Sequence, residues 1–79
     1  MFVRVDPDRR WSGARLRAAR EAAGMTLTEL AASAGVAANT AWRWEADYAA
    51  PGIHSVVKIL AQLGCTLDDL TAPITAPAA

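Results

Sequence analysis

Apolar residues recur at helical spacing in the middle of the chain, and local signals mark where this helix begins and ends. The apolar positions are Leu30, Ala31 and Ala34, which share one face of a helix with about 3.6 residues per turn. Thr26 and Glu29 have the spacing of a capping box, in which each residue bonds a backbone N–H of the other. Gly35 follows, and glycine readily adopts the positive φ that ends helices. We therefore predict a helix between these two signals.

A second helix is predicted over about residues 37–46, directly after a short turn. Ala41 and Trp44 lie three residues apart on one face, whereas Asn39 and Arg43 lie four apart on another. The alanines of the preceding helix are small enough to let the two helices cross closely. The pattern predicts a compact helix-turn-helix.

Three further helical segments flank this pair. A helix over about residues 12–23 has Ser12 as a suitable N-cap, and its apolar stripe consists of Leu16, Ala19 and Ala23. A helix over about residues 53–63 is expected to bury an apolar face made of Ile53, Val56, Leu60 and Leu63. Residues 66–70 predict a short, capped fifth helix, whose two leucines either close the core or form a dimer seam.

Both ends of the chain predict flexible segments outside a domain at residues 12–70. Residues 1–11 form an N-terminal arm, in which residues 2–5 alternate like a short strand before an Asp-Pro pair ends it. We expect this arm to be loose or disordered, and pairing with the arm of a second chain is the alternative. Residues 71–79 are rich in proline and alanine, so a disordered tail is expected.

Positive charge is concentrated in the first part of the chain, although the net charge is zero. Seven arginines face four acidic residues up to and including Arg43, which gives +3, whereas one lysine faces four acidic residues from Trp44 onward, which gives −3. This asymmetry suits a nucleic-acid-facing side and a partner-facing side. A chain of 79 residues forms one small domain of marginal stability, which association into a dimer would raise.

The sequence offers little for catalysis or for a metal. The single cysteine, Cys65, excludes an internal disulfide and a four-cysteine zinc site. With a single histidine, His54, the sequence also has no His/Cys cluster. Cys65 is expected to be a small buried apolar side chain. We therefore predict that the protein is not an enzyme and uses no cofactor. No apolar run approaches the roughly 20 residues that cross a membrane, and no signal-peptide core is present, so we expect a cytoplasmic protein without a membrane partner.

Landmark residues along residues 12–70 carry a resemblance to a known family. They are Leu16, Arg20, Gly24, the box from Thr26 to Ala31, Gly35, Val36, Trp44, Glu45, Pro51 and the closing segment from Leu67 to Leu70. With these spacings the chain resembles the lambda-repressor-like DNA-binding domain, also called the Cro/C1 or XRE type. The resemblance implies an all-α fold, namely a compact five-helix helix-turn-helix domain with a flexible N-terminal arm and C-terminal tail.

The resemblance also implies which residues would meet DNA. The helix over residues 37–46 would lie in the major groove, and the base-reading positions would be Ala38, Asn39, Trp42 and Arg43. The expected phosphate contacts are Arg15, Arg17 and Thr26. Arg20 and Glu45 would form a largely buried ion pair that ties the first helix to the third, and neither would touch DNA.

The chain departs from the family pattern near this face. Leu27 stands where a phosphate-binding glutamine is common, Ala37 replaces a capping serine, and Asp47 replaces a common glycine. Leu27, Ala38 and Trp42 could together form an apolar patch, and exposed apolar patches often mark protein contacts.

Two functions are consistent with these features. The first is a sequence-specific regulator, a repressor or Cro-like protein, that binds double-stranded DNA as a homodimer and reads a pseudo-palindrome. The alternative is a protein-interaction module, such as the antitoxin of a toxin–antitoxin pair or a helix-turn-helix that has lost DNA binding. The landmark residues favour the first function, whereas the apolar patch and the zero net charge favour the alternative.

Overall fold

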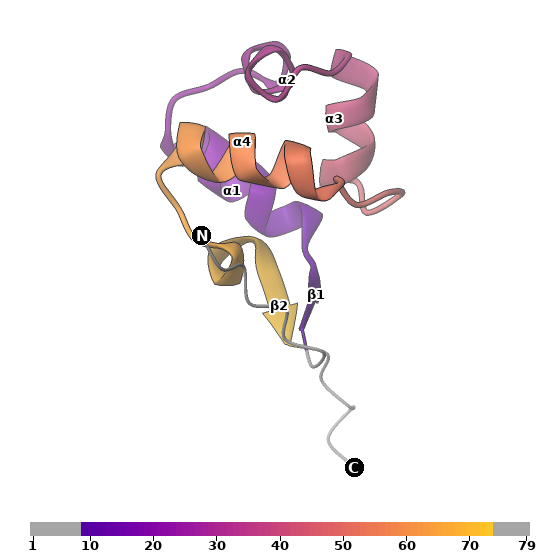
Figure 1. Ribbon diagram of the computed structural model, residues 1–79, viewed down its shortest axis with the longest axis vertical. Helices are drawn as coiled ribbons and strands as arrows, with labels where there is room; N and C mark the ends of the chain where they lie inside the picture. Colours follow the sequence, from indigo (N-terminus) through magenta and orange to yellow (C-terminus); the bar gives the residue numbers. More distant parts are fainter. Residues whose placement is uncertain (1–8, 74–79) are drawn as a thin grey trace.

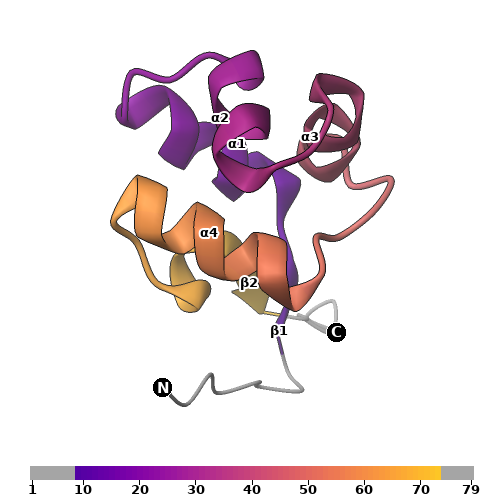
Figure 2. The ribbon, with the colours of Figure 1, turned by 45° about the horizontal axis from the view of Figure 1, so that its top comes forward.

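A computed structural model describes residues 9–73, which form a helical domain with a small two-stranded sheet (Figure 1). In chain order the elements are β1 Arg9–Trp11, α1 Gly13–Ala22, α2 Leu27–Ala34, α3 Ala38–Glu45, α4 Ile53–Leu63, a 3₁₀ helix Leu67–Leu70 and β2 Thr71–Pro73. α2 packs against α3 and α4, and α1 packs against α3 and the 3₁₀ helix (Figure 2). The predictions for residues 1–8 and 74–79 lie outside the described residues.

The local signals that bound the first two helices act as predicted. The side chain of Ser12 caps α1. At α2, Thr26 Oγ1 accepts a hydrogen bond from Glu29 N at 3.1 Å, and Glu29 Oε1 accepts one from Thr26 N at 2.8 Å. Gly35 ends α2 with a φ of 74°, a conformation that carries a steric penalty for residues with a Cβ. The predicted capping box and the helix-turn-helix are therefore confirmed.

The capping box predicts an acid-sensitive contribution to stability. Hydrogen bonding with Thr26, foremost from its backbone N–H, lowers the pKa of Glu29 from its ordinary value of 4.5. Because this pKa is lower in the folded than in the unfolded state, the contribution is present above about pH 4.5 and is lost as the pH falls through the folded value. We expect Glu29→Gln, which keeps the accepting oxygen, to lose less melting temperature than the wild type between pH 7 and pH 3. Asp69 also has a lowered pKa, but it is present in both proteins and affects both melting temperatures alike. Equal losses of melting temperature in the variant and in the wild type would therefore contradict the prediction.

The predicted fifth helix is a single 3₁₀ turn, so the described chain has four α-helices rather than five. Asp69 N donates to Thr66 O at 3.0 Å, which is the i→i+3 pattern of a 3₁₀ helix. The Asp69 carboxylate accepts from Thr66 N at 2.9 Å, and the chain enters β2 directly after Leu70. One turn is all that the segment between Thr66 and β2 accommodates.

The hydrophobic core takes one large, fully buried side chain from each of four elements. These are Leu16 of α1, Leu30 of α2, Ile59 of α4 and Leu70 of the 3₁₀ helix. Small buried residues of α2 and α3 allow the two helices to approach closely; they are Ala31, Ala34 and Ala41. Of the two roles expected for the leucines of the last helix, Leu70 takes the first and closes the core.

Two expectations about buried faces are wrong. Ile53 is 54% exposed, and Ile59 rather than Ile53 is a core residue of α4. Ile53 is the first residue of α4, whereas the buried Val56 and Ile59 lie farther along the helix. Ala23 is exposed because it follows the last residue of α1.

Parts of the expected arm and tail pair with each other. β1 and β2 form an antiparallel sheet in which Arg9 faces Pro73, Arg10 faces Ala72 and Trp11 faces Thr71; both strands lie side by side in Figure 1. For residues 9–11 and 71–73 the prediction of flexible segments is therefore wrong. Leu70 is anchored in the core, and Ser12 N donates to Leu70 O at 3.0 Å, which brings the two strands together.

Candidate nucleic-acid interface

The outer face of α3 carries all four side chains predicted to read bases. Ala38, Asn39, Trp42 and Arg43 are exposed. Ala41 and Trp44, on the opposite face, are buried against the core. The packing of α3 against α1 and α2 thus leaves one side of the helix free, and that side holds the predicted set.

The N-terminal end of α3 has no side-chain cap. Ala37 occupies the N-cap position in an extended conformation and makes no capping hydrogen bond, as its methyl group requires. The first N–H groups of a helix point along its axis and favour acceptors or negative charge. The uncapped end lies next to Ala38 and Asn39, so its backbone N–H groups add hydrogen-bond donors beside these two residues.

A bidentate ion pair joins α1 to the C-terminal end of α3, as the resemblance implied. Arg20 Nε donates to Glu45 Oε2 at 2.7 Å, and Arg20 Nη2 donates to Glu45 Oε1 at 3.2 Å. Arg20 Nη1 also donates to Met25 O at 2.9 Å. The side chains of Arg20 and Glu45 are only 13% and 8% exposed, and the hydrogen bond to Glu45 raises the pKa of Arg20. The pair therefore fixes α3 and leaves neither side chain free for a ligand.

Two contacts that the sequence did not predict hold the same end of α3. Trp11 Nε1 donates to Trp44 O at 2.8 Å, and Asp47 Oδ1 accepts from Gly13 N at 2.7 Å. Asp47 has a φ of 62°, so it adopts the left-handed conformation that a glycine would favour and adds a carboxylate. No local signal pointed to Trp11 or Gly13, because their partners lie more than thirty residues away.

The three predicted phosphate contacts have different surroundings. Arg15 and Arg17 are both exposed on α1, but Arg17 pairs with Glu21 at 3.5 Å. Hydrogen bonding with Thr66 lowers the pKa of Asp69, and the charge of Arg15 lowers it further, which places Arg15 toward the 3₁₀ helix. The hydroxyl of Thr26 accepts within the capping box.

A hollow of about 350 Å³ lies between α1, α2 and α3. Its lining residues are Arg17, Arg20, Leu27, Trp42, Glu45 and Ala46. Trp42 is 49% exposed, and its ring lies 5.6 Å from that of Tyr48 between centroids, with an angle of 31° between the planes. Leu27 and Trp42 of the predicted apolar patch thus share one hollow, whereas Ala38 is not part of its lining.

Other chemistry is sparse in the described chain. Within residues 9–73 no group of three or more His, Cys, Asp or Glu side chains could hold a metal ion. Cys65 is half-buried beside the core, and burial raises the pKa of its thiol. Over the same residues none of the helices has the length and apolar character of a membrane-spanning segment.

Comparison with known proteins identifies a family. A family model described as a helix-turn-helix matches residues 16–70, from the middle of α1 to the last residue of the 3₁₀ helix. A comparison with curated proteins finds no significant match. The matched range contains the whole of α2, α3 and α4.

Proposed function

Because the chain belongs to the Cro/C1-type helix-turn-helix family of DNA-binding regulators, we propose that it is a sequence-specific repressor or Cro-like protein. Members of this family are not generally enzymes. In our proposal two copies bind one pseudo-palindromic DNA site, and each copy places α3 in the major groove. The observation that carries the proposal is the exposed outer face of α3, behind which the helix is fixed to α1 and α2.

The side chains of this face have complementary reading chemistry. Asn39 can bond N6 and N7 of adenine, and Arg43 can bond O6 and N7 of guanine. Ala38 offers a methyl group to thymine, and Trp42 offers an apolar surface with a single donor. Asn39 and Arg43 lie four residues apart on α3, about one helical turn, so they address neighbouring base pairs.

Backbone contacts would come from the elements that flank α3. Arg17 lies beside Leu27 and Trp42, which favours it as a phosphate contact next to the reading helix. Thr26 stands at the start of α2, where a helix N-terminus favours negative charge. Arg15, on the side of Asp69, would reach only a more distant phosphate.

A homodimer would place two α3 helices about 34–36 Å apart, one turn of DNA. Leu70 is fully buried and Arg9–Trp11 are paired with β2, so neither suits a dimer seam as it stands. Ile53 and Val57 are about half exposed and lie four residues apart on α4. These two side chains suit a contact between copies better.

We expect Asn39→Ala and Arg43→Ala to weaken binding to the preferred site by about 1–3 kcal/mol each and to relax the preference at the contacted base. The measurement is selection of binding sites from random DNA, followed by fluorescence anisotropy with the selected and a scrambled sequence. Lys58→Ala serves as a charge control, because Lys58 is exposed on α4. If both α3 variants retained the sequence preference of the wild type, the reading role of this face would be refuted.

One observation favours a second candidate function, a protein-interaction module such as an antitoxin. Leu27 and the half-exposed Trp42 line a hollow beside α3 together with the charged side chains of Arg17, Arg20 and Glu45, and the apolar part of this surface suits a protein side chain. A defined partner that co-purifies from the native host, and that Trp42→Ala no longer retains, would support this candidate. A protein that purifies alone while binding one DNA site tightly would count against it.

A further inference from the structure

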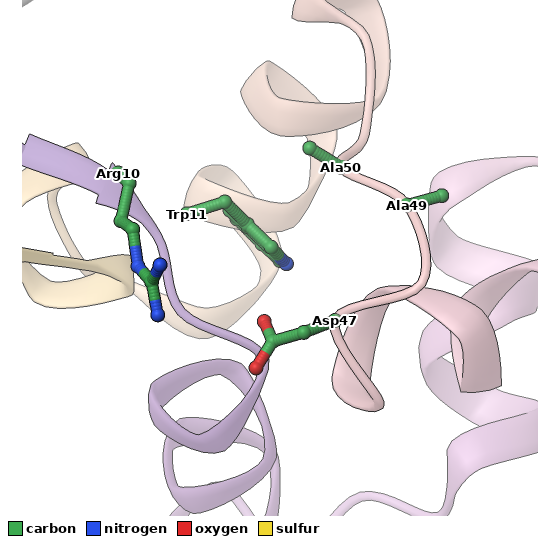
Figure 3. A pocket seen from close by; sticks show the side chains of 5 residues that line it. All are labelled: Arg10, Trp11, Asp47, Ala49 and Ala50. Carbon is green, nitrogen blue, oxygen red and sulfur yellow. The ribbon is translucent and has the colours of Figure 1, made fainter.

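The C-terminal end of α3 is held by the residues that lead into α1. Trp11 Nε1 donates to Trp44 O at 2.8 Å, and Gly13 N donates to Asp47 Oδ1 at 2.7 Å. In Figure 3 the Trp11 indole extends from β1 toward the loop of Ala49 and Ala50, and the Asp47 carboxylate lies close by. Trp44 O belongs to the last turn of α3, where carbonyl groups lack an α-helical partner, and it also accepts a longer backbone bond from Asp47 N at 3.4 Å.

The donor of this contact is itself tied to the core. Trp11 faces Thr71 in the β1–β2 sheet. The next residue, Ser12, donates its backbone N–H to Leu70 O at 3.0 Å, and Leu70 is fully buried. The indole N–H therefore connects α3 to the β1–β2 sheet and to Leu70, which lie outside the helix-turn-helix.

The position of the C-terminal end of α3 determines where its other end points. α3 has eight residues and is about 12 Å long, at about 1.5 Å per residue. A tilt of about 5° at one end shifts the other end by about 1 Å, and a shift of that size is enough to lengthen a 2.9 Å hydrogen bond beyond useful distance. Asn39 stands at the end that would shift.

We propose that Trp11 is a positioning residue for DNA reading: its indole N–H, bonded to Trp44 O, sets the angle at which α3 presents Asn39 and Arg43. This inference rests on the proposed function, since it concerns how the same face reads DNA. Trp11 itself need not touch DNA. Its effect is on discrimination between sequences rather than on attraction to the phosphate backbone.

The test is Trp11→Phe, which removes the N–H and keeps an aromatic ring. Trp11 lines a surface hollow of about 290 Å³, so the smaller ring leaves no closed cavity; Trp11→Leu is prepared as a second variant, because leucine has no side-chain donor either. Tyr48→Phe is the control, because it also removes one donor from an aromatic ring near the end of α3 but lies outside this contact. The readout is the ratio of affinities for the selected site and a scrambled site, measured at two salt concentrations. Partial unfolding lowers both affinities by the same factor and leaves the ratio unchanged.

We expect the ratio to fall about tenfold in Trp11→Phe, which is the size of a weakened base contact. The salt dependence should be unchanged because no charge is removed, and Tyr48→Phe should keep the wild-type ratio within about twofold. A ratio in the Trp11 variants within about twofold of the wild type would overturn the inference and leave the proposed function intact. A wild type that prefers no sequence would overturn the proposed function, and this inference with it.

Discussion

Replacing Gly13 with alanine is expected to destabilise the protein by about 3 kcal/mol, in the upper range for overpacking a close contact. A Cβ at this position would lie 2.5 Å from Trp44 O and closer still to Glu45 O. Both obstacles are backbone atoms at the end of α3, so a rotamer change cannot relieve them. α1 would have to move away from α3, which would weaken the bond between Gly13 N and Asp47.

Thermal unfolding followed by circular dichroism measures this effect. For a domain of this size, about 3 kcal/mol corresponds to a fall in melting temperature of about 15 °C. Gly52→Ala is the matched control, because a Cβ at Gly52 meets nothing within 4 Å and its φ is an ordinary −71°. We expect that control to stay within about 1 kcal/mol of the wild type. If Gly13→Ala had the same melting temperature as the wild type, α1 and α3 would approach less closely than described.

Breaking the Arg20–Glu45 pair is expected to have an effect of similar size. Arg20→Met leaves the Glu45 carboxylate only 8% exposed without its cation, and removing one partner of a buried pair costs about 3–5 kcal/mol. We expect about 3 kcal/mol, because the Arg20 side chain retains some exposure, 13%. The variant should also lose sequence-specific DNA binding if α3 shifts.

Urea denaturation of a double-mutant cycle separates the pair from its parts. Arg20→Met combined with Glu45→Leu should recover much of the stability, because an apolar pair leaves no buried charge unpaired. Arg17→Met is the control on the same helix: its pair with Glu21 is 3.5 Å long and more than half exposed on both sides, so less than about 0.5 kcal/mol is expected. Equal losses for the Arg17 and Arg20 variants would mean that burial does not distinguish the two ion pairs.

The two stability predictions and the positioning role of Trp11 concern one junction. Gly13, Arg20 and Trp11 all contact the last residues of α3 or the residue after the helix C-cap. The exposed reading face itself makes few contacts within the chain. In the proposed function, sequence preference thus depends on residues of β1 and α1 that lie outside the reading face.

The sequence alone was sufficient for the features that depend on neighbours in the chain. The capping box of Thr26 and Glu29 and the turn at Gly35 involve residues at most a few positions apart, and such signals act whatever the rest of the chain does. The exposed and buried faces of α3 followed from helical periodicity. The Arg20–Glu45 pair came only from the family resemblance, because nothing local joins residues 25 positions apart.

Tertiary structure decided what depends on distant partners. β1 and β2 are about 60 residues apart in the chain and each has three residues, too short to form a sheet unaided; burial of Leu70 brings them together. Burial likewise selected Ile59 over Ile53 in α4, because both positions fit an apolar helix face and only the covering helices distinguish them. The bonds that Trp11 and Asp47 make at the α1–α3 junction arise for the same reason, since a hydrogen bond across more than thirty residues forms only once the core has fixed both partners in place.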